Sequence, residues 1–166
     1  MANYAVAASA DDGYTGTIND TSGTTIVAAW TYGPDTQLTG FANINTSAIG
    51  TDTISAATLW FWHVGYTLTS PAPTRQRRIK VGGTTILDTT VAAGAAGWKS
   101  EVLTAGELAL INKTGVTNVV FEVDDPGSGG RSWQLQSWDY SDHSRAPYLA
   151  VTHAAAGGPT KFSVLR

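Results

Sequence analysis

The sequence predicts an all-β domain, an antiparallel β-sandwich of the jelly-roll type with one short helix. Three observations predict this fold. Thr and Gly, which are typical of strands and turns, are abundant, with 24 and 18 copies among 166 residues. Short apolar segments alternate with turn signals along the chain, and a single segment has helical features. Many short strands joined by short turns favour a closed or sandwiched antiparallel sheet.

The first half of the chain contains the strongest strand signal. Apolar strands are expected at 4–9, 24–30, 38–44 and 54–65, with turns at Asp11-Asp12-Gly13 and Gly33-Pro34-Asp35. One face of the strand at 54–65 carries Leu59, Phe61 and His63, and the other carries Trp60, Trp62 and Val64. Because both faces are apolar, we expect this strand in the middle of a sheet, covered on both sides.

The second half contains the helix signal. A strand at 75–81 is expected to form a hairpin with 84–88 through Gly82-Gly83, and further strands are expected at 98–103, 117–123, 132–138 and 147–153. Thr104 and Glu107 have the spacing of a capping box, and Gly115 follows as a stop signal. These residues predict a helix at about 105–112.

The chain divides into a domain and an extension. Residues 1–153 form the predicted sandwich, and 154–166 begin with small residues and end in an apolar tail. The tail is either disordered or an arm, because alternating Phe162 and Val164 would suit a strand added to a neighbouring sheet. As an arm, its contact residues would be Lys161, Phe162, Val164 and Leu165.

Composition excludes several classes of function. The absence of Cys excludes disulfides, thiolate metal sites and a Cys nucleophile. A net charge of −3 argues against a dedicated nucleic-acid binder, which needs a basic surface. No apolar run is long enough to cross a membrane. The first residues lack the basic and apolar regions of a secretory signal, so we expect none.

Two pairs of tryptophans are candidate binding residues. Trp60 and Trp62 share a strand face and could form a platform on which sugar rings stack, although core packing is the favoured interpretation. Trp133 and Trp138 are five residues apart and would face opposite ways in an unbroken strand. We therefore expect one of them in the core, and the other, Trp138, at a possible interface.

Charged residues give two further candidates. Arg75, Arg77, Arg78 and Lys80 could form a surface for an anionic partner, but a charged edge strand that resists aggregation is favoured. Paired carboxylates could bind calcium, or could simply occupy turns, at Asp11, Asp12, Asp124 and Asp125. No metal or other cofactor is the prediction, with calcium as the alternative.

Histidines provide the one candidate for catalysis. His143 lies near Asp139, Ser141, Asp142 and Ser144, but no nucleophile-elbow motif accompanies them. A loop before the last strand is the favoured interpretation, so no catalytic residue is assigned. His63 is expected to be hydrogen-bonded within the sheet and His153 to lie in the last strand. Three scattered histidines without thiols make no zinc motif.

Four segments in order resemble a known family. They are Ala8-x-x-Asp11-Asp12-Gly13-Tyr14, the segment Phe41–Ile49, Ile54–Leu59 leading into the aromatic strand, and Ala146-Pro147-Tyr148-Leu149 with Val151-Thr152. This pattern resembles the DNRLRE-type and carbohydrate-binding-module-like jelly-roll domains. These domains occur in bacterial surface proteins and in bacteriophage virion proteins. The segment 41–49 departs from the family by having Ala42 and Asn43 where an Asp is usual.

The resemblance and the composition together predict a structural role in a virion. We expect a non-enzymatic bacteriophage capsid decoration (cement) protein, made in the host cytoplasm and exposed on the particle. Its expected partners are a capsid or other virion protein and further copies of itself, for example in a trimer. The alternative is a carbohydrate-binding module of a tail fibre or cell-surface protein. A hydrolase is the third class, and it would depend on His143.

Overall fold

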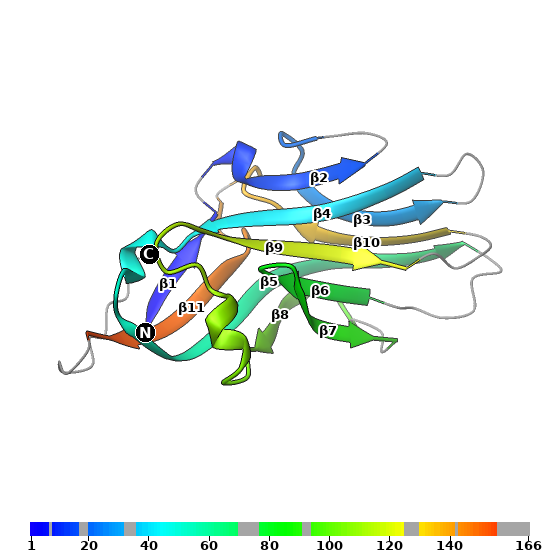
Figure 1. Ribbon diagram of the computed structural model, residues 1–166. Coiled ribbons are helices and arrows are strands. Elements are labelled where there is room, and N and C mark those ends of the chain that lie inside the picture. The colour runs from blue at the N-terminus through cyan, green and yellow to red at the C-terminus, as the bar shows by residue number, and fades with distance from the viewer. Residues whose placement is uncertain are drawn as a thin grey trace.

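Antiparallel strands form almost the whole molecule (Figure 1). The computed structural model describes residues 1–6, 8–16, 20–31, 36–69, 77–90, 94–124, 130–141 and 143–155. The strands in these ranges are β1 (Ala2–Ala5), β2 (Asp12–Gly16), β3 (Thr25–Thr31), β4 (Thr36–Asn45), β5 (Thr53–Thr69), β6 (Arg77–Val81), β7 (Thr84–Thr89), β8 (Gly97–Val102), β9 (Val116–Val123), β10 (Gly130–Gln136) and β11 (Tyr148–Ala154). The predicted all-β sandwich is confirmed.

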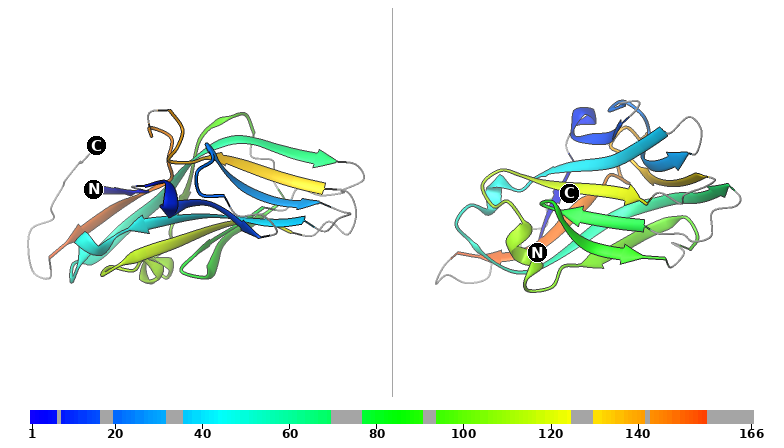
Figure 2. Two further views of the ribbon diagram at one scale, coloured as in Figure 1. Left: turned by 90° about the horizontal axis from the view of Figure 1, so that it is seen from above. Right: turned by 45° about the vertical axis from the view of Figure 1, so that its right-hand side comes forward.

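The strands form one curled sheet that folds into two layers (Figure 2). The strand order is β1-β11-β5-β10-β3-β4-β9-β6-β7, with β2 paired to β4 and β8 paired to β5. Strands β5, β10 and β11 lie in one layer, and β4, β9 and β6 lie in the other. The sheet passes from one layer to the other at β3 and β4, so the two inner faces enclose a single core.

Strand β5 is the central element of its layer. It pairs with β11 through Thr53–Trp60 and with β10 through His63–Thr69, and β8 pairs with it through 58–63. Its alternating side chains therefore point either into the core or onto the outer face of the layer. The prediction placed this strand in mid-sheet, which is correct. It also placed a covering layer on both faces, whereas the Trp60 face is only half-buried.

Large aromatic side chains join the two layers. Phe61 of β5, Phe121 of β9 and Trp133 of β10 are buried and meet edge to face, with ring centroids 5.6–5.8 Å apart. Edge-to-face packing brings the positive ring edge against the negative ring face. The predicted assignment of one of Trp133 and Trp138 to the core is confirmed by Trp133.

The predicted helix at 105–112 is shorter than expected. It is a single 3₁₀ turn, η3 (Glu107–Leu110), and two further such turns are η1 (Ser9–Asp11) and η2 (Ser47–Ile49). The Glu107 carboxylate accepts hydrogen bonds from both the backbone N–H and the hydroxyl of Thr104, each at 2.7 Å. One half of the predicted capping box is thus present, whereas the Glu107 backbone N–H donates to the Thr104 carbonyl oxygen and not to its hydroxyl. A segment this short gains too little backbone bonding to continue as an α-helix.

The segment Asp11-Asp12-Gly13 is a strand entry, where the sequence predicted a turn. Gly13 has φ +141°, and a Cβ at this position would lie 2.1 Å from the carbonyl oxygen of Asp20. Only glycine allows the backbone around Asp20 to approach so closely, and Tyr14 and Asp20 then exchange two backbone hydrogen bonds. This close pairing gives a structural reason for the Asp-Gly-Tyr motif.

The boundary between β6 and β7 agrees with the sequence prediction, whereas the strand expected at 4–9 is β1, Ala2–Ala5. Gly82 and Gly83 form the predicted hairpin turn between β6 and β7. Strand β11 ends at Ala154, and the arm residues Lys161, Phe162, Val164 and Leu165 lie outside the described residues, as do Arg75, Asp125 and Asp142. Within the described ranges, no helix is long and apolar enough to cross a membrane.

Candidate functional site

Four aromatic side chains gather on the outer face of β5 and its neighbours, and we call them the aromatic patch: Trp60, Trp62, Trp98 and Tyr148. Strand register explains the gathering. Trp60 lies directly opposite Tyr148 of β11, and Trp62 lies directly opposite Trp98 of β8. Directly opposed residues of antiparallel strands share a face. Three strands far apart in the sequence therefore supply one surface.

The rings of the aromatic patch hold one another in place. Trp60 and Tyr148 are nearly parallel, at 9° with centroids 6.2 Å apart. Trp98 stands edge-on to Trp60, Trp62 and Tyr148, at centroid distances of 6.5, 5.7 and 5.5 Å. Because each ring contacts at least one other ring and is carried by a paired strand, the patch is a rigid surface.

Arg145 covers one end of the aromatic patch. Its guanidinium carbon lies 4.0 Å from the ring centre of Trp62 and 4.5 Å from that of Tyr140. A cation over a ring face is attracted by the negative face of the ring. Arg145 is half-buried and forms no ion pair with any carboxylate in the part of the chain that the structure describes.

The open part of the surface lies along β8. Trp98 is 37% exposed and Val102 is 74% exposed, with the exposed Ser100 between them on the same face. This arrangement changes the sequence interpretation of Trp60 and Trp62. The favoured interpretation, that Trp60 and Trp62 pack in the core, is wrong, because both are half-buried on the outer face. The platform alternative named the face of β5 that points outward, but Arg145 covers Trp62, and the most exposed ring of the patch is Trp98.

Sequence reasoning missed Trp98 and Tyr148 as site residues. Both lay in correctly predicted strands, at 98–103 and 147–153. Their position beside Trp60 depends on the pairing of β5 with β8 and β11, across 38 and 88 residues of chain. A local pattern carries no information about which distant strands pair. One signal in the sequence could have indicated Trp98. Alternation in its short strand places Trp98 on one face with Ser100 and Val102.

The inner face of β5 carries a buried polar network instead of a site. His63 is buried, and its Nδ1 accepts a hydrogen bond from the indole N–H of Trp133 at 3.2 Å. Burial, with the charges of Arg77 and Lys99, lowers the pKa of His63. Burial likewise raises the pKa of Glu101, and the charge of Arg77 opposes this change. The predicted hydrogen-bonded sheet position of His63 is confirmed.

Arg77 was predicted to lie on a surface for an anionic partner, but it is buried. It is only 6% exposed, and its guanidinium lies 5.1 Å from the ring centre of Trp133. Alternation in β6 points it inward, whereas Arg78 and Lys80 point outward. The favoured explanation, a charged edge strand, is also wrong for β6, because β6 pairs with both β7 and β9.

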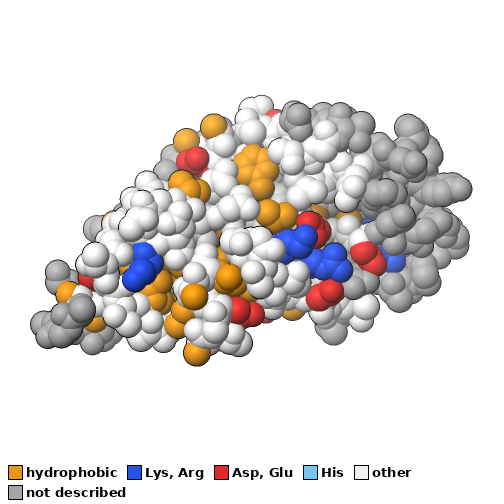
Figure 3. Space-filling view, viewed as in Figure 1, with side chains coloured by type: hydrophobic (Ala, Val, Ile, Leu, Met, Phe, Trp, Pro, Cys, Tyr) orange, Lys and Arg blue, Asp and Glu red, His pale blue; other side chains and the backbone are white. Residues whose placement is uncertain are grey.

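The outward charges of β6 are neutralised by their neighbours. Arg78 contacts Asp88 at 3.1 Å and Glu122 at 3.7 Å, and Lys80 contacts Glu122 at 2.8 Å. In Figure 3, basic and acidic side chains lie next to each other over this region. Since each cation already has a carboxylate partner, this row is a balanced surface and a poor attractor for an anion.

Two of the carboxylates predicted to bind calcium already contact other groups of the protein. Asp124 pairs with the buried Arg131. Asp12 is fully buried, and its Oδ2 accepts a hydrogen bond from the Trp138 backbone N–H at 2.8 Å, while its Oδ1 has no hydrogen-bond partner among the described residues. Burial raises the pKa of Asp12 to about 7, and the charges of Asp139 and Asp11 add to this rise.

No group of three or more His, Cys, Asp or Glu side chains within the described ranges has the arrangement of a metal site. Asp12 and Asp11 are adjacent in the chain, but Asp11 is half-buried at the end of η1 while Asp12 points inward. Calcium binding remains a sequence prediction.

His143 is positioned by Trp138. The two rings stack with centroids 4.0 Å apart at 12°, and His143 Nδ1 contacts the Trp138 carbonyl oxygen. His143 makes no contact with a carboxylate in the described part of the chain. Trp138 is half-buried beneath this histidine, and its predicted interface role stays a prediction.

A second histidine, His153, connects the first and last strands. Its Nε2 lies 3.0 Å from the Tyr4 hydroxyl, and its Nδ1 lies 2.7 Å from Asp52 Oδ2. The sequence correctly placed His153 in the last strand. All three side chains are largely covered, and the contacts fasten β1 and β11 to the start of β5.

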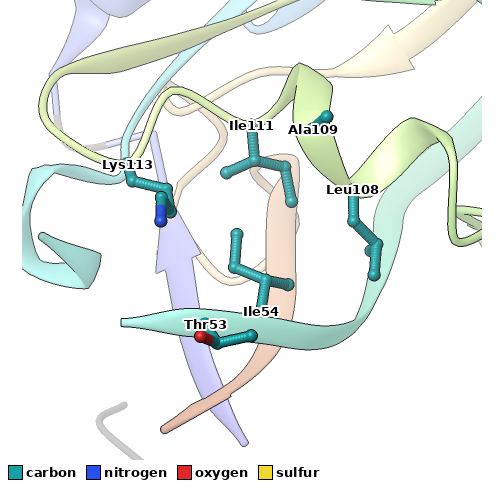
Figure 4. A pocket seen from close by; sticks show the side chains of 6 residues that line it. All are labelled: Thr53, Ile54, Leu108, Ala109, Ile111 and Lys113. Atoms are coloured by element: carbon teal, nitrogen blue, oxygen red, sulfur yellow. The ribbon is translucent and has the colours of Figure 1, made fainter. Parts of the chain in front are cut away.

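A pocket of about 370 Å³ lies beside these contacts, between the start of β5 and the η3 segment (Figure 4). Its lining residues are Thr53, Ile54, Leu108, Ala109, Ile111 and Lys113. The Lys113 ammonium donates to the carbonyl oxygen of Asp52 at 2.9 Å. The pocket therefore offers apolar walls and one engaged cation, with no group poised for recognition.

Comparisons with known proteins assign no family. No family model matches the chain, and no curated protein matches it. Among solved structures, the chain is similar to the exo-β-1,3-galactanase of Phanerochaete chrysosporium in complex with β-1,3-galactotriose, at 10% identity and a TM-score of 0.32. The match covers 80% of this chain and 28% of that chain, so this chain spans less than a third of its length. A likeness at this level carries no argument about function.

Proposed function

We propose that this protein is a non-catalytic binding domain whose aromatic patch stacks against the sugar rings of a glycan. The observation that carries the proposal is the outward-facing cluster of Trp60, Trp62, Trp98 and Tyr148 on a rigid sheet. Aromatic clusters in a sandwich domain normally lie in the core, where Phe61 and Trp133 already serve that purpose. A second cluster outside the core needs a different explanation.

The chemistry of the surface suits a saccharide. The C–H-rich face of a sugar ring packs against the negative face of an aromatic ring, and its hydroxyls stay in water. Ser100 and Arg145 place hydrogen-bonding groups beside the rings. A platform formed from three paired strands loses little conformational entropy on binding, because the rings are already held by one another.

Titration of the protein with a panel of oligosaccharides, followed by tryptophan fluorescence and calorimetry, tests this proposal. Trp98→Ala is expected to weaken binding at least about fivefold, since a well-placed aromatic contact contributes about 1–3 kcal/mol. The matched control is Val116→Ala, which shortens an exposed apolar side chain on β9, in the other layer. If Trp98→Ala binds as the wild type does, the aromatic patch is not the binding surface.

Capsid decoration is the second candidate, and it is favoured by the exposure of Val102 next to Trp98. Exposed aromatic and aliphatic side chains are also typical of protein interfaces. The role would require binding to a virion protein, together with self-association that the extension 154–166 would support. Deletion of 154–166, with particle binding and oligomer mass as readouts, tests it. Unchanged particle binding and unchanged mass would remove the arm from this model.

A further inference from the structure

We propose that the aromatic patch selects an acidic saccharide, one whose rings carry carboxylates, and that Arg145 recognises the carboxylate. This inference rests on the proposed glycan-binding function and names the class of glycan. The observation behind it is the position of the Arg145 guanidinium carbon over the rings of Trp62 and Tyr140, at 4.0 and 4.5 Å from the ring centres.

A guanidinium held in this way is prepared to bind a carboxylate. The guanidinium carbon lies over both rings, and its N–H groups donate to no acceptor among the described residues, so they are available to an external one. The N–H groups match the two oxygens of a carboxylate in a bidentate pair. Because two rings fix the orientation of the guanidinium, little entropy is lost when the anion binds.

The surroundings leave this cation without an anion of the protein itself. Arg78 and Lys80 each contact a carboxylate, whereas Arg145 contacts none in the described part of the chain. The outward residues beside the patch are Thr58, Ser100 and Val102, and none of them is acidic. Glu101 is on the inward face of β8, opposite Leu59. Among the described residues, an external carboxylate would therefore meet an arginine that no carboxylate of the protein contacts.

The number of cations separates a sugar acid from a nucleic acid. Single-stranded nucleic acids also stack on aromatic rings, but each nucleotide adds a phosphate, and their binding surfaces follow the backbone with several Lys or Arg residues. Arg145 is the one cation that contacts the aromatic patch among the described residues, and the whole chain carries a net charge of −3. One arginine beside several rings fits one carboxylate beside several sugar rings.

Oligogalacturonates and oligomannuronates, each compared with its own methyl ester, are the probes that test the inference. Esterification removes the charge and keeps the sugar ring. Wild-type protein is expected to bind at least one acid about tenfold or more tightly than its ester, as expected for a hydrogen-bonded charge pair. Arg145→Gln should abolish this preference, because binding of the acid falls much more than binding of the ester. Arg145→Lys, which keeps the charge without the planar N–H edges, should restore only part of it.

The outcomes distinguish the two proposals. Equal binding of acid and ester by the wild type, with both lost in Trp98→Ala, would overturn the acidic specificity and leave glycan binding intact. Binding of no oligosaccharide in the panel would overturn both. Tighter binding of a single-stranded oligothymidylate than of either acid would replace the sugar acid with a nucleic acid. Thermal unfolding of Arg145→Gln, compared with Val116→Ala, shows that the variant is folded.

Discussion

Successive side chains of β5 point to opposite faces of the sheet, and the two faces have different environments. On the inner face, Phe61 is 1% exposed and contacts Phe121 and Trp133 from the opposite layer and the neighbouring strand. On the outer face, Trp60 and Trp62 contact rings of adjacent strands and remain half-buried. Alternate residues of one aromatic strand therefore belong to the core and to the candidate site. Whether a residue points inward or outward decides which of the two it joins.

A sandwich can carry an external aromatic surface when its core is complete without those rings. The core is completed by the inner face, so the outer rings are not needed to exclude water from it. They cover one another through edge-to-face contacts, which limits the apolar area left in solvent. We expect substitutions on the inner face to cost folding stability, and substitutions on the outer face to cost binding.

The largest effect is expected for Phe61→Ala. Removing this buried ring leaves a cavity among Phe121, Trp133 and their neighbours, and should lower the free energy of unfolding by about 3–5 kcal/mol. Chemical denaturation measures this loss. A loss below about 1 kcal/mol would mean that the inner face is not the principal core.

Asp12 provides the next test of the inner face, because its carboxyl group is buried. Its pKa of about 7 in the folded protein exceeds the value of 3.8 for the free side chain. The folded state thus binds the proton more tightly, so the contribution of Asp12 to stability is greatest below about pH 4, falls as the pH rises to about 7 and levels off above that. The fall attributable to this group is at most about 4 kcal/mol.

Asp12→Asn should remove most of this pH dependence, since the amide oxygen still accepts from Trp138 and no charge is buried. Midpoints of denaturation at pH 5 and pH 8 measure the effect. Millimolar calcium chloride is expected to leave the wild-type melting temperature unchanged. A calcium-dependent rise that disappears in Asp12→Asn would assign a cation to this position and contradict the expectation.

On the outer face, Trp98→Ala should change stability by only about 0.5–1.5 kcal/mol, the range for aromatic contacts beyond simple burial. Its main effect is expected on glycan binding. Denaturation and titration of the same preparation compare the two effects directly. A stability loss as large as that of Phe61→Ala would erase the distinction between the two faces.

Glu107→Ala tests an outward group whose expected role is structural. Loss of the two hydrogen bonds to Thr104 should lower stability by about 0.5–1 kcal/mol and leave glycan binding unchanged. Glu107→Gln, which keeps an acceptor oxygen, is the matched control and should lose less. Thermal unfolding of both variants gives the measurement. An equal loss in both would show that the negative charge, and not the acceptor, stabilises the segment.

The sequence predicted local features well because their causes are local. Alternation and turn residues located nearly every strand, and the contact between Thr104 and Glu107 follows from a spacing of three residues. Two errors had local causes as well. Nothing in the residues around Arg77 indicates which face of β6 points inward, and β2 was not predicted because Asp12-Gly13 has the composition of a turn.

The candidate site was less predictable because its geometry depends on distant pairings. The pairings of Trp62 with Trp98 and of Trp60 with Tyr148 are set by the order and register of β8, β5 and β11. Arg145 reaches Trp62 from the loop before β11. Neither relation is visible in any single segment. Trp60 and Trp62 could be identified as candidates, but their companions could not.

The pairing of β1 with β11 also has a mechanical consequence. Ala2 lies opposite Val151 and Ala5 lies opposite Tyr148, so the start of β1 and the end of β11 are at the same end of the ribbon. Tension applied through these two points would break the hydrogen bonds between β1 and β11 sequentially, beginning at that end. Strand β1 would then peel away at modest force, with the Tyr4–His153 contact as an early point of resistance, while β5 stays held by three neighbours. The domain could lengthen under load while the aromatic patch stays in place.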